Sequence, residues 1–131
     1  MTPEVPPAAY VIAMLQLSGM GPARLALLLR DRTPKDAWRL ITERRAAPLL
    51  GASGHKLPNV AEWQTQAKQI DLAKLYAAHE SVTLMLRGSD TYPRRLCDDI
   101  EAPEMLFGLG RCTLGNSPTV AVVGTRRCTR Y

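Results

Sequence analysis

The stretch from Gly124 to Arg127 combines residue types that suit an anion. It follows the apolar run 119–123 and reads Gly-Thr-Arg-Arg. A glycine turn after a strand exposes backbone N–H groups, and a threonine hydroxyl and an arginine fork add donors around the same space, as in phosphate sites. Arg126 is the first candidate for a phosphate contact. The alternative is that Gly124 only permits a turn and that the arginines are solvated. The candidate phosphate-binding residues are Gly124, Thr125, Arg126, Arg127 and Thr129.

A second candidate anion site lies near the start of the chain, in the sequence S-G-M-G-P-A-R-L. Gly19 and Gly21 permit a tight turn, and Pro22 suits the first position of a following helix. Two helices joined in this way predict a helix-hairpin-helix unit, whose free amides meet nucleic-acid phosphates without reading bases. Arg24 and Arg30 could extend such a contact. Alternatively the turn only closes two helices into a compact module, and both interpretations stay open here.

The sequence predicts no metal site, no cofactor and no catalytic group. The three cysteines are widely spaced and have no histidine nearby, which predicts reduced thiols. The acidic residues of 98–104 lack a further spaced ligand and predict a solvated loop. No G-x-G-x-x-G follows the run 119–123, so a nucleotide cofactor is not indicated. Arg44 and Arg45 are expected to complement the dipole at a helix end.

The apolar pattern predicts helices over the first 80 residues. One covers 8–17, a second runs from 23 to about 30, and a third begins at a Thr33 cap followed by Pro34 and Asp36. Residues 46–58 predict a loop, and Asn59 is expected to cap a helix of about 20 residues that ends near residue 79. Trp38 and Trp63 fall on the inward stripes. Residues 1–80 are therefore predicted to form an all-α domain of the SAM-like or helix-hairpin-helix kind.

After residue 80 the pattern changes to short strands, at 82–86, 105–109 and 119–123. The last run is apolar throughout, as expected of a parallel strand that is covered on both faces. Such a strand needs neighbours, so we expect the natural protein to continue past Tyr131. The predicted fold class is α+β, with residues 81–131 as the first strands of a truncated Rossmann-like α/β domain.

Composition and charge describe an ordinary globular chain with a basic excess. Apolar residues make up 46% and charged residues 22%, and 17 Lys and Arg against 12 Asp and Glu leave a net charge of +5. Most of the basic residues are arginines, which makes a polyanion a plausible partner, although a solvated basic surface would account for the charge equally well. The apolar run 8–17 is too short to cross a bilayer and lacks the opening of a signal peptide.

The stretch after Leu86 also carries a family pattern. It reads G-S-D-T-Y-P-R-R-L-C-D-D-I-E-A-P-E-M-L-F-G-L-G and later V-A-V-V-G-T-R-R-C-T-R-Y. This order of residues resembles the DprA/Smf family of DNA-processing proteins. Thr125 stands where serine is usual, which keeps the hydroxyl. The matching residues are Asp90, Tyr92, Pro93, Leu96, Ile100, Pro103, Leu106, Phe107, Gly110, Val123, Gly124, Arg126, Thr129 and Tyr131.

The resemblance implies a protein that binds single-stranded DNA and hands it to the RecA recombinase during natural transformation and recombination. The reduced cysteines predict a cytoplasmic location. The resemblance also implies a homodimer formed through the later part of the domain, and no catalysis. Two alternatives remain. One is a helical protein-interaction module, and the other is an enzyme related to the Rossmann-like nucleotide phosphoribohydrolases.

Overall fold

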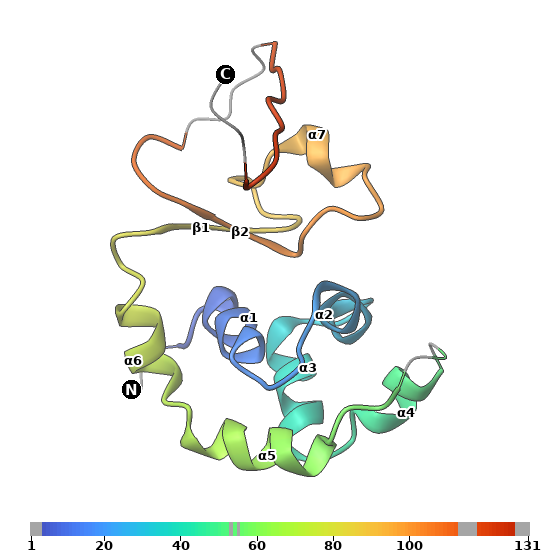
Figure 1. The fold of residues 1–131 in the computed structure, drawn as a ribbon. Helices are drawn as coiled ribbons and strands as arrows, with labels where there is room; N and C mark the ends of the chain where they lie inside the picture. The colour runs from blue at the N-terminus through green and yellow to red at the C-terminus, as the bar shows by residue number, and fades with distance from the viewer. Residues whose placement is uncertain (1–3, 53, 55, 113–117, 128–131) are drawn as a thin grey trace.

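The computed structural model describes residues 4–52, 54, 56–112 and 118–127. A layer of helices carries a small β-hairpin, and the segment after the hairpin extends beyond it (Figure 1). The described part is thus mixed and helix-rich, in agreement with the predicted α+β class. The helices are α1 Pro7–Leu15, α2 Pro22–Leu29, α3 Pro34–Thr42, α4 Ala47–Gly51, α5 Val60–Gln69, α6 Leu72–Ala77 and α7 Arg94–Cys97, and the strands are β1 Thr83–Leu86 and β2 Met105–Gly108.

The first two helices lie close to their predicted positions. Both begin with proline at the first turn, where the missing N–H costs nothing. α1 ends at Leu15, two residues before the predicted end, because the chain turns through residues 16–20 toward Gly19. Gly19 has φ +70°, a left-handed conformation that glycine adopts without strain. The predicted glycine turn between two helices is therefore present.

Helix α3 has the predicted cap. The Thr33 hydroxyl oxygen accepts a hydrogen bond from the backbone N–H of Asp36 at 3.1 Å, and the two side chains lie 2.6 Å apart. The cap satisfies an amide that has no partner inside the helix. Ala37, Trp38 and Ile41 form its buried stripe.

Two predictions for the middle of the chain were wrong. The predicted loop 46–58 contains the short helix α4, which begins with Ala-Pro and packs on α2. The predicted long helix is broken in two at Ile70, whose backbone is extended (ψ 117°). The cause is Asp71, whose carboxylate accepts from the Lys74 N–H at 3.1 Å and so caps a new helix, α6. A strong internal cap thus overrode the apolar period.

The strands at 83–86 and 105–108 confirm two of the three predicted runs, and they pair antiparallel with Thr83 opposite Gly108 and Leu86 opposite Met105. The third prediction, a strand over 119–123, is contradicted. Residues 118–127 carry no strand and are exposed throughout, and Val122 has 94% of its surface accessible. In the described part of the chain this run has no neighbouring strand, so nothing pairs its backbone.

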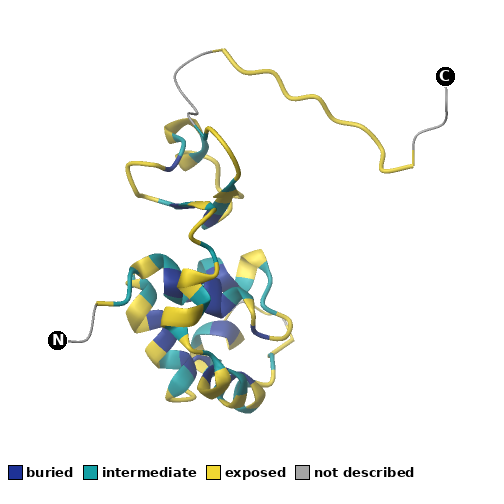
Figure 2. Cartoon of the chain, turned by 90° about the vertical axis from the view of Figure 1, so that its left-hand side faces the viewer, coloured by how far each residue is buried: buried dark blue, intermediate teal, exposed yellow. Residues whose placement is uncertain are grey.

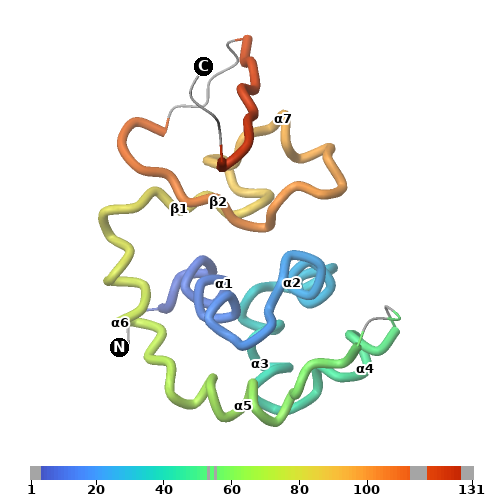
Figure 3. Tube along the Cα trace, viewed as in Figure 1, coloured from blue at the N-terminus to red at the C-terminus, as the bar shows by residue number. Residues whose placement is uncertain are grey.

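Helix α1 lies at the centre of the core. It contacts α3, α6 and β1, and Figure 2 shows many of the buried residues gathered inside the helical part of the molecule. Trp63 from α5 is 1% exposed, and Trp38 from α3 is 8% exposed, which confirms both as core residues. Met105 belongs to the same buried cluster, and Leu84 and Leu86 pack against it. The hairpin therefore sits on the helical core, and the chain enters it directly after α6 (Figure 3). None of the described helices is long and apolar enough to cross a membrane.

The cap of α3 provides a test of this local structure. Replacing Thr33 with alanine is expected to lower the free energy of unfolding by about 1 kcal/mol, because the Asp36 amide loses its acceptor. Urea denaturation measures the change. The control is Thr65→Ala within α5, where the hydroxyl only donates back to the Ala61 carbonyl, so the free energy should stay within about 0.5 kcal/mol. Equal losses in the two variants would contradict the capping role.

The boundary near residue 80 stays a prediction and has its own test. A chain of residues 1–80 keeps the mutual burial of α1, α3 and α5 but loses Met105 and the two hairpin leucines from the core edge. We expect dispersed amide signals in NMR together with a melting temperature below that of the whole chain. A random-coil spectrum would show that the helices need the hairpin to fold.

Candidate nucleic-acid interface

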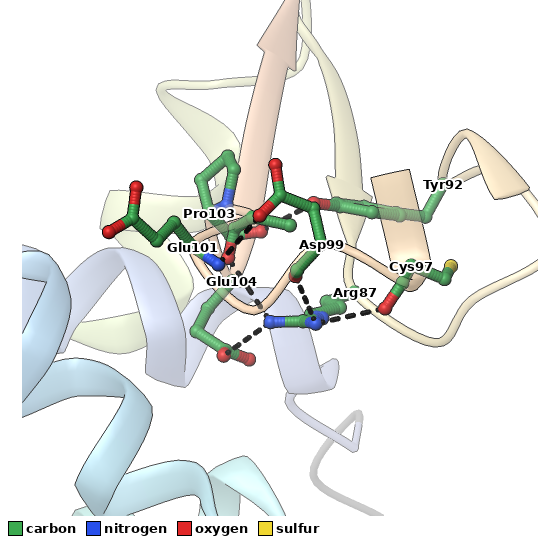
Figure 4. A network of polar contacts seen from close by, with 8 residues as sticks. Arg87, Tyr92, Cys97, Asp99, Glu101, Pro103 and Glu104 are labelled. Atoms are coloured by element: carbon green, nitrogen blue, oxygen red, sulfur yellow. Dashed lines mark hydrogen bonds and ion pairs between the residues drawn. The ribbon is translucent and has the colours of Figure 1, made fainter. Parts of the chain in front are cut away.

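Arg87, the residue after β1, organises the loop between the two strands. Its guanidinium donates to the carbonyl oxygens of Cys97 at 3.0 Å, Asp99 at 2.9 Å and Ala102 at 3.2 Å, and it forms an ion pair with the Glu104 carboxylate at 3.5 Å. Figure 4 shows these contacts converging on one side chain. The planar fork of five donors suits arginine to this task. Arg87 therefore holds α7 and the following turn against the hairpin.

Tyr92 fixes the other side of this loop. Its ring is 2% exposed and its hydroxyl donates to the Pro103 carbonyl at 2.6 Å (Figure 4). Burial raises the pKa of the Tyr92 phenol above its ordinary value of 10.0, and the nearby Arg87 charge opposes this shift. The Tyr-Pro of the family pattern is thus a structural element. Phe107 of the same pattern is different, since 48% of its side chain is exposed and it lies beside the ring of His79.

The predicted helix-hairpin-helix turn between α1 and α2 is held by hydrogen bonds to other parts of the chain. The Ser18 carbonyl accepts from the Trp63 indole N–H at 2.8 Å, and the Ser18 backbone N–H donates to the Gln66 side chain at 3.0 Å. The Arg24 guanidinium donates to the carbonyl oxygens of Gly19 and Lys56. Arg24 is therefore engaged in closing the turn onto the chain before α5, which favours the structural interpretation of this turn. Gly21 has open space around its Cα.

The predicted phosphate turn lies in the exposed segment 118–127. The Thr125 hydroxyl oxygen accepts from the Arg127 backbone N–H at 3.3 Å, so this hydroxyl and this amide face each other. The side chains of Arg126 and Arg127 are exposed and make no hydrogen bond or ion pair with a described residue. A Cβ on Gly124 would meet nothing within 4 Å. Both guanidinium groups are therefore available to a partner, while Thr129 lies outside the described residues.

The two candidate sites are not brought together. Figure 2 shows the segment 118–127 running away from the hairpin and the helices, whereas the turn at Gly19 and Gly21 is packed between α1, α2 and α5. The sequence reasoning missed Arg87. No local pattern marks it, because its acceptors are carbonyls 10 to 15 residues away. It also treated Glu104 as solvated, although that carboxylate pairs with Arg87.

Other reactive groups serve local structure. His79 lies 2.8 Å from the Leu75 carbonyl at the end of α6. Cys97 is an exposed free thiol. No group of three or more His, Cys, Asp or Glu within 4–52, 54, 56–112 and 118–127 is placed to hold a metal ion.

The Tyr92 contact generates a prediction for stability and its pH dependence. Tyr92→Phe removes the hydrogen bond to Pro103 and should lower the free energy of unfolding by about 1 kcal/mol at neutral pH. Because the folded pKa is raised, the unfolded chain releases this proton first, so wild-type stability should fall as pH rises above about 10. The variant should lose that part of the fall.

Urea titrations at pH values on both sides of this range measure the effect. Tyr76→Phe is the control, because Tyr76 is 40% exposed. An alkaline decline that is identical in wild type and Tyr92→Phe would contradict the assignment.

Comparison with known proteins gives one match. The sequence profile of the family described as DNA recombination-mediator protein A matches residues 83–131. No curated protein and no solved structure matches the chain. The matched stretch contains both strands, the loop held by Arg87 and the Gly-Thr-Arg-Arg turn, and it leaves the helices of residues 7–77 outside. The match confirms the resemblance inferred from the same residues. Over residues 83–131, the chain is therefore similar to the DNA recombination-mediator protein A family.

Proposed function

We propose that the chain is a single-stranded-DNA-binding recombination mediator that delivers DNA to the RecA recombinase in natural transformation. The observation that carries the proposal is the family match over residues 83–131. The protein acts in the cytoplasm by binding, without catalysis of its own. Homodimerisation through the α/β domain belongs to the same proposal.

The geometry of the segment 118–127 supports a role in binding DNA. Arg126 and Arg127 are adjacent and exposed. The Thr125 hydroxyl accepts from the Arg127 N–H and so closes a short turn around Arg126. Arginine forks bind phosphate oxygens with two parallel hydrogen bonds, and such contacts supply most of the sequence-independent affinity for nucleic acid. Two arginines give a modest, salt-dependent contact of the kind that a mediator of many sequences needs.

The finer fold assignments are part of this proposal. A SAM-like or helix-hairpin-helix domain agrees with two short helices, α1 and α2, joined by a turn with glycine in the left-handed conformation. A Rossmann-like domain for residues 81–131 is supported by the family match alone.

The test measures binding of a fluorescein-labelled oligothymidylate by anisotropy as salt is varied. In the full-length protein, Arg126→Ala is expected to cost about 1 to 3 kcal/mol of binding free energy, because a charge-assisted hydrogen bond to phosphate is lost. Arg126→Ala/Arg127→Ala should also lower the slope of log affinity against log salt by about 1.4, at about 0.7 per phosphate.

The control is Lys35→Ala/Lys68→Ala, which removes the same charge from exposed positions on α3 and α5. Wild-type affinity in the arginine variant would rule out the turn as the DNA site. RecA filament assembly on the oligonucleotide, with and without the protein, tests the delivery step.

A further inference from the structure

A basic hollow lies on the helical part of the molecule, away from the segment 118–127. Two adjoining cavities of about 490 and 460 Å³ share Arg32, Pro48 and Leu49 in their walls. Arg30 completes the first wall, and Arg44 and Arg45 line the second. Four arginines from the ends of α2 and α3 thus gather around the start of α4. We call this surface the α4 hollow.

Strained turns place these arginines there. Asp31 and Arg44 have φ of 56° and 59°, and they are the non-glycine residues with positive φ in the described chain. Each residue directly follows a helix or its last turn, and its left-handed conformation lets the next backbone N–H donate to a helix carbonyl. Arg32 donates to Leu29, and Arg45 donates to Leu40. A side chain in this conformation costs about 1 to 2 kcal/mol, and glycine would avoid it. Both turns keep a charged residue instead.

The charge of the α4 hollow is available for an anion. The guanidinium groups of Arg30 and Arg44 make no hydrogen bond or ion pair with any described residue. Arg32 donates to the Arg30 carbonyl at 2.8 Å. Two carboxylates lie nearby, Asp31 in the wall and Glu43, which faces Arg45 at 3.4 Å across an exposed pair. Because exposed pairs of this kind are weak, a phosphate can compete for Arg45.

Part of the lining of the α4 hollow is apolar. Leu27, Pro48 and Leu49 line it, and the two leucines are half-buried. A chain with regularly spaced phosphates and flat apolar faces matches a hollow lined by both arginines and apolar side chains. A membrane surface fits less well, because lipid-binding faces project apolar side chains outward, whereas these line a depression.

We propose that the α4 hollow is a second contact for the backbone of single-stranded nucleic acid. The inference that the anion is a nucleic acid rests on the proposed function, whereas the inference that the hollow binds an anion rests on the arginines alone. The hollow lies at the far end of α2 from the Gly19 turn, about 12 Å away at the rise of an α-helix. The helical part therefore binds DNA through the ends of α2 and α3, and not through the turn that Arg24 closes.

The test is the double substitution Arg30→Ala/Arg44→Ala in the whole chain, with the labelled oligothymidylate as probe. Affinity should fall roughly tenfold at about 0.1 M salt, and the salt slope should fall by about 1.4, for two lost phosphate contacts. The matched control Lys35→Ala/Lys68→Ala has the same net charge and should change affinity less than twofold. Arg30→Lys/Arg44→Lys should recover part of the loss, because the charge stays and the fork is lost.

Melting temperatures confirm that the variants are folded, and Arg30→Gln/Arg44→Gln replaces the alanine variant if that one is not. Equal losses of affinity in Arg30→Ala/Arg44→Ala and in the control Lys35→Ala/Lys68→Ala overturn the proposal, since net charge alone would explain them. An unchanged salt slope also overturns it. Loss of binding to phosphatidylserine vesicles or to polyglutamate, with oligonucleotide affinity intact, assigns the hollow to another partner. If Arg126→Ala/Arg127→Ala alone weakens binding, the proposed function stands and this inference falls.

Discussion

Helix α1 is apolar around nearly its whole circumference, and no single neighbour can cover it. Residues 11–14 are all at most 1% exposed, which requires partners on several sides at once. Those partners are α3, α6 and β1, elements that lie far apart in the sequence. Since burial of apolar area supplies most of the favourable free energy of folding, this requirement fixes the arrangement of the rest. It draws the hairpin onto the helices and ties the stretch matched by the family to the helical part.

Arg87 has a comparable role in the other half of the chain. The loop between β1 and β2 buries Tyr92 and Ala102, and its backbone carbonyls need donors as it turns back. One guanidinium supplies three of them and meets Glu104 as well. The ion pair is largely shielded, with 25% and 17% of the two side chains exposed, so removing Arg87 would leave both a carboxylate and carbonyls without partners. Arg87 thus holds the loop together by polar contacts, as α1 holds the helices together by apolar burial.

Local signals allowed much of this to be predicted, and their range explains the failures. The Thr33 cap, the prolines that begin α1, α2 and α3, and the glycine turn act within a few residues, and the structure confirms each. Asp71 is also a local cap, but it lay inside a continuous apolar period that predicted one long helix. The apolar run 119–123 predicted a strand, yet a strand requires a partner that the run itself cannot specify. The role of Arg87 could not be predicted, because its acceptors are carbonyls far along the chain whose positions only the fold determines.

The arginines show why residue type alone does not identify a binding site. Arg24 lies in a predicted anion-binding turn and Arg87 directly follows a strand, yet each donates to backbone carbonyls and is committed to the fold. Arg126 lies in an exposed segment with no such acceptor nearby. Folded chains satisfy their carbonyls wherever donors reach them, so an arginine that reaches none keeps its fork for an external anion. By this criterion the candidate anion-binding surface of the helical part is at the strained ends of α2 and α3, and not at the glycine turn.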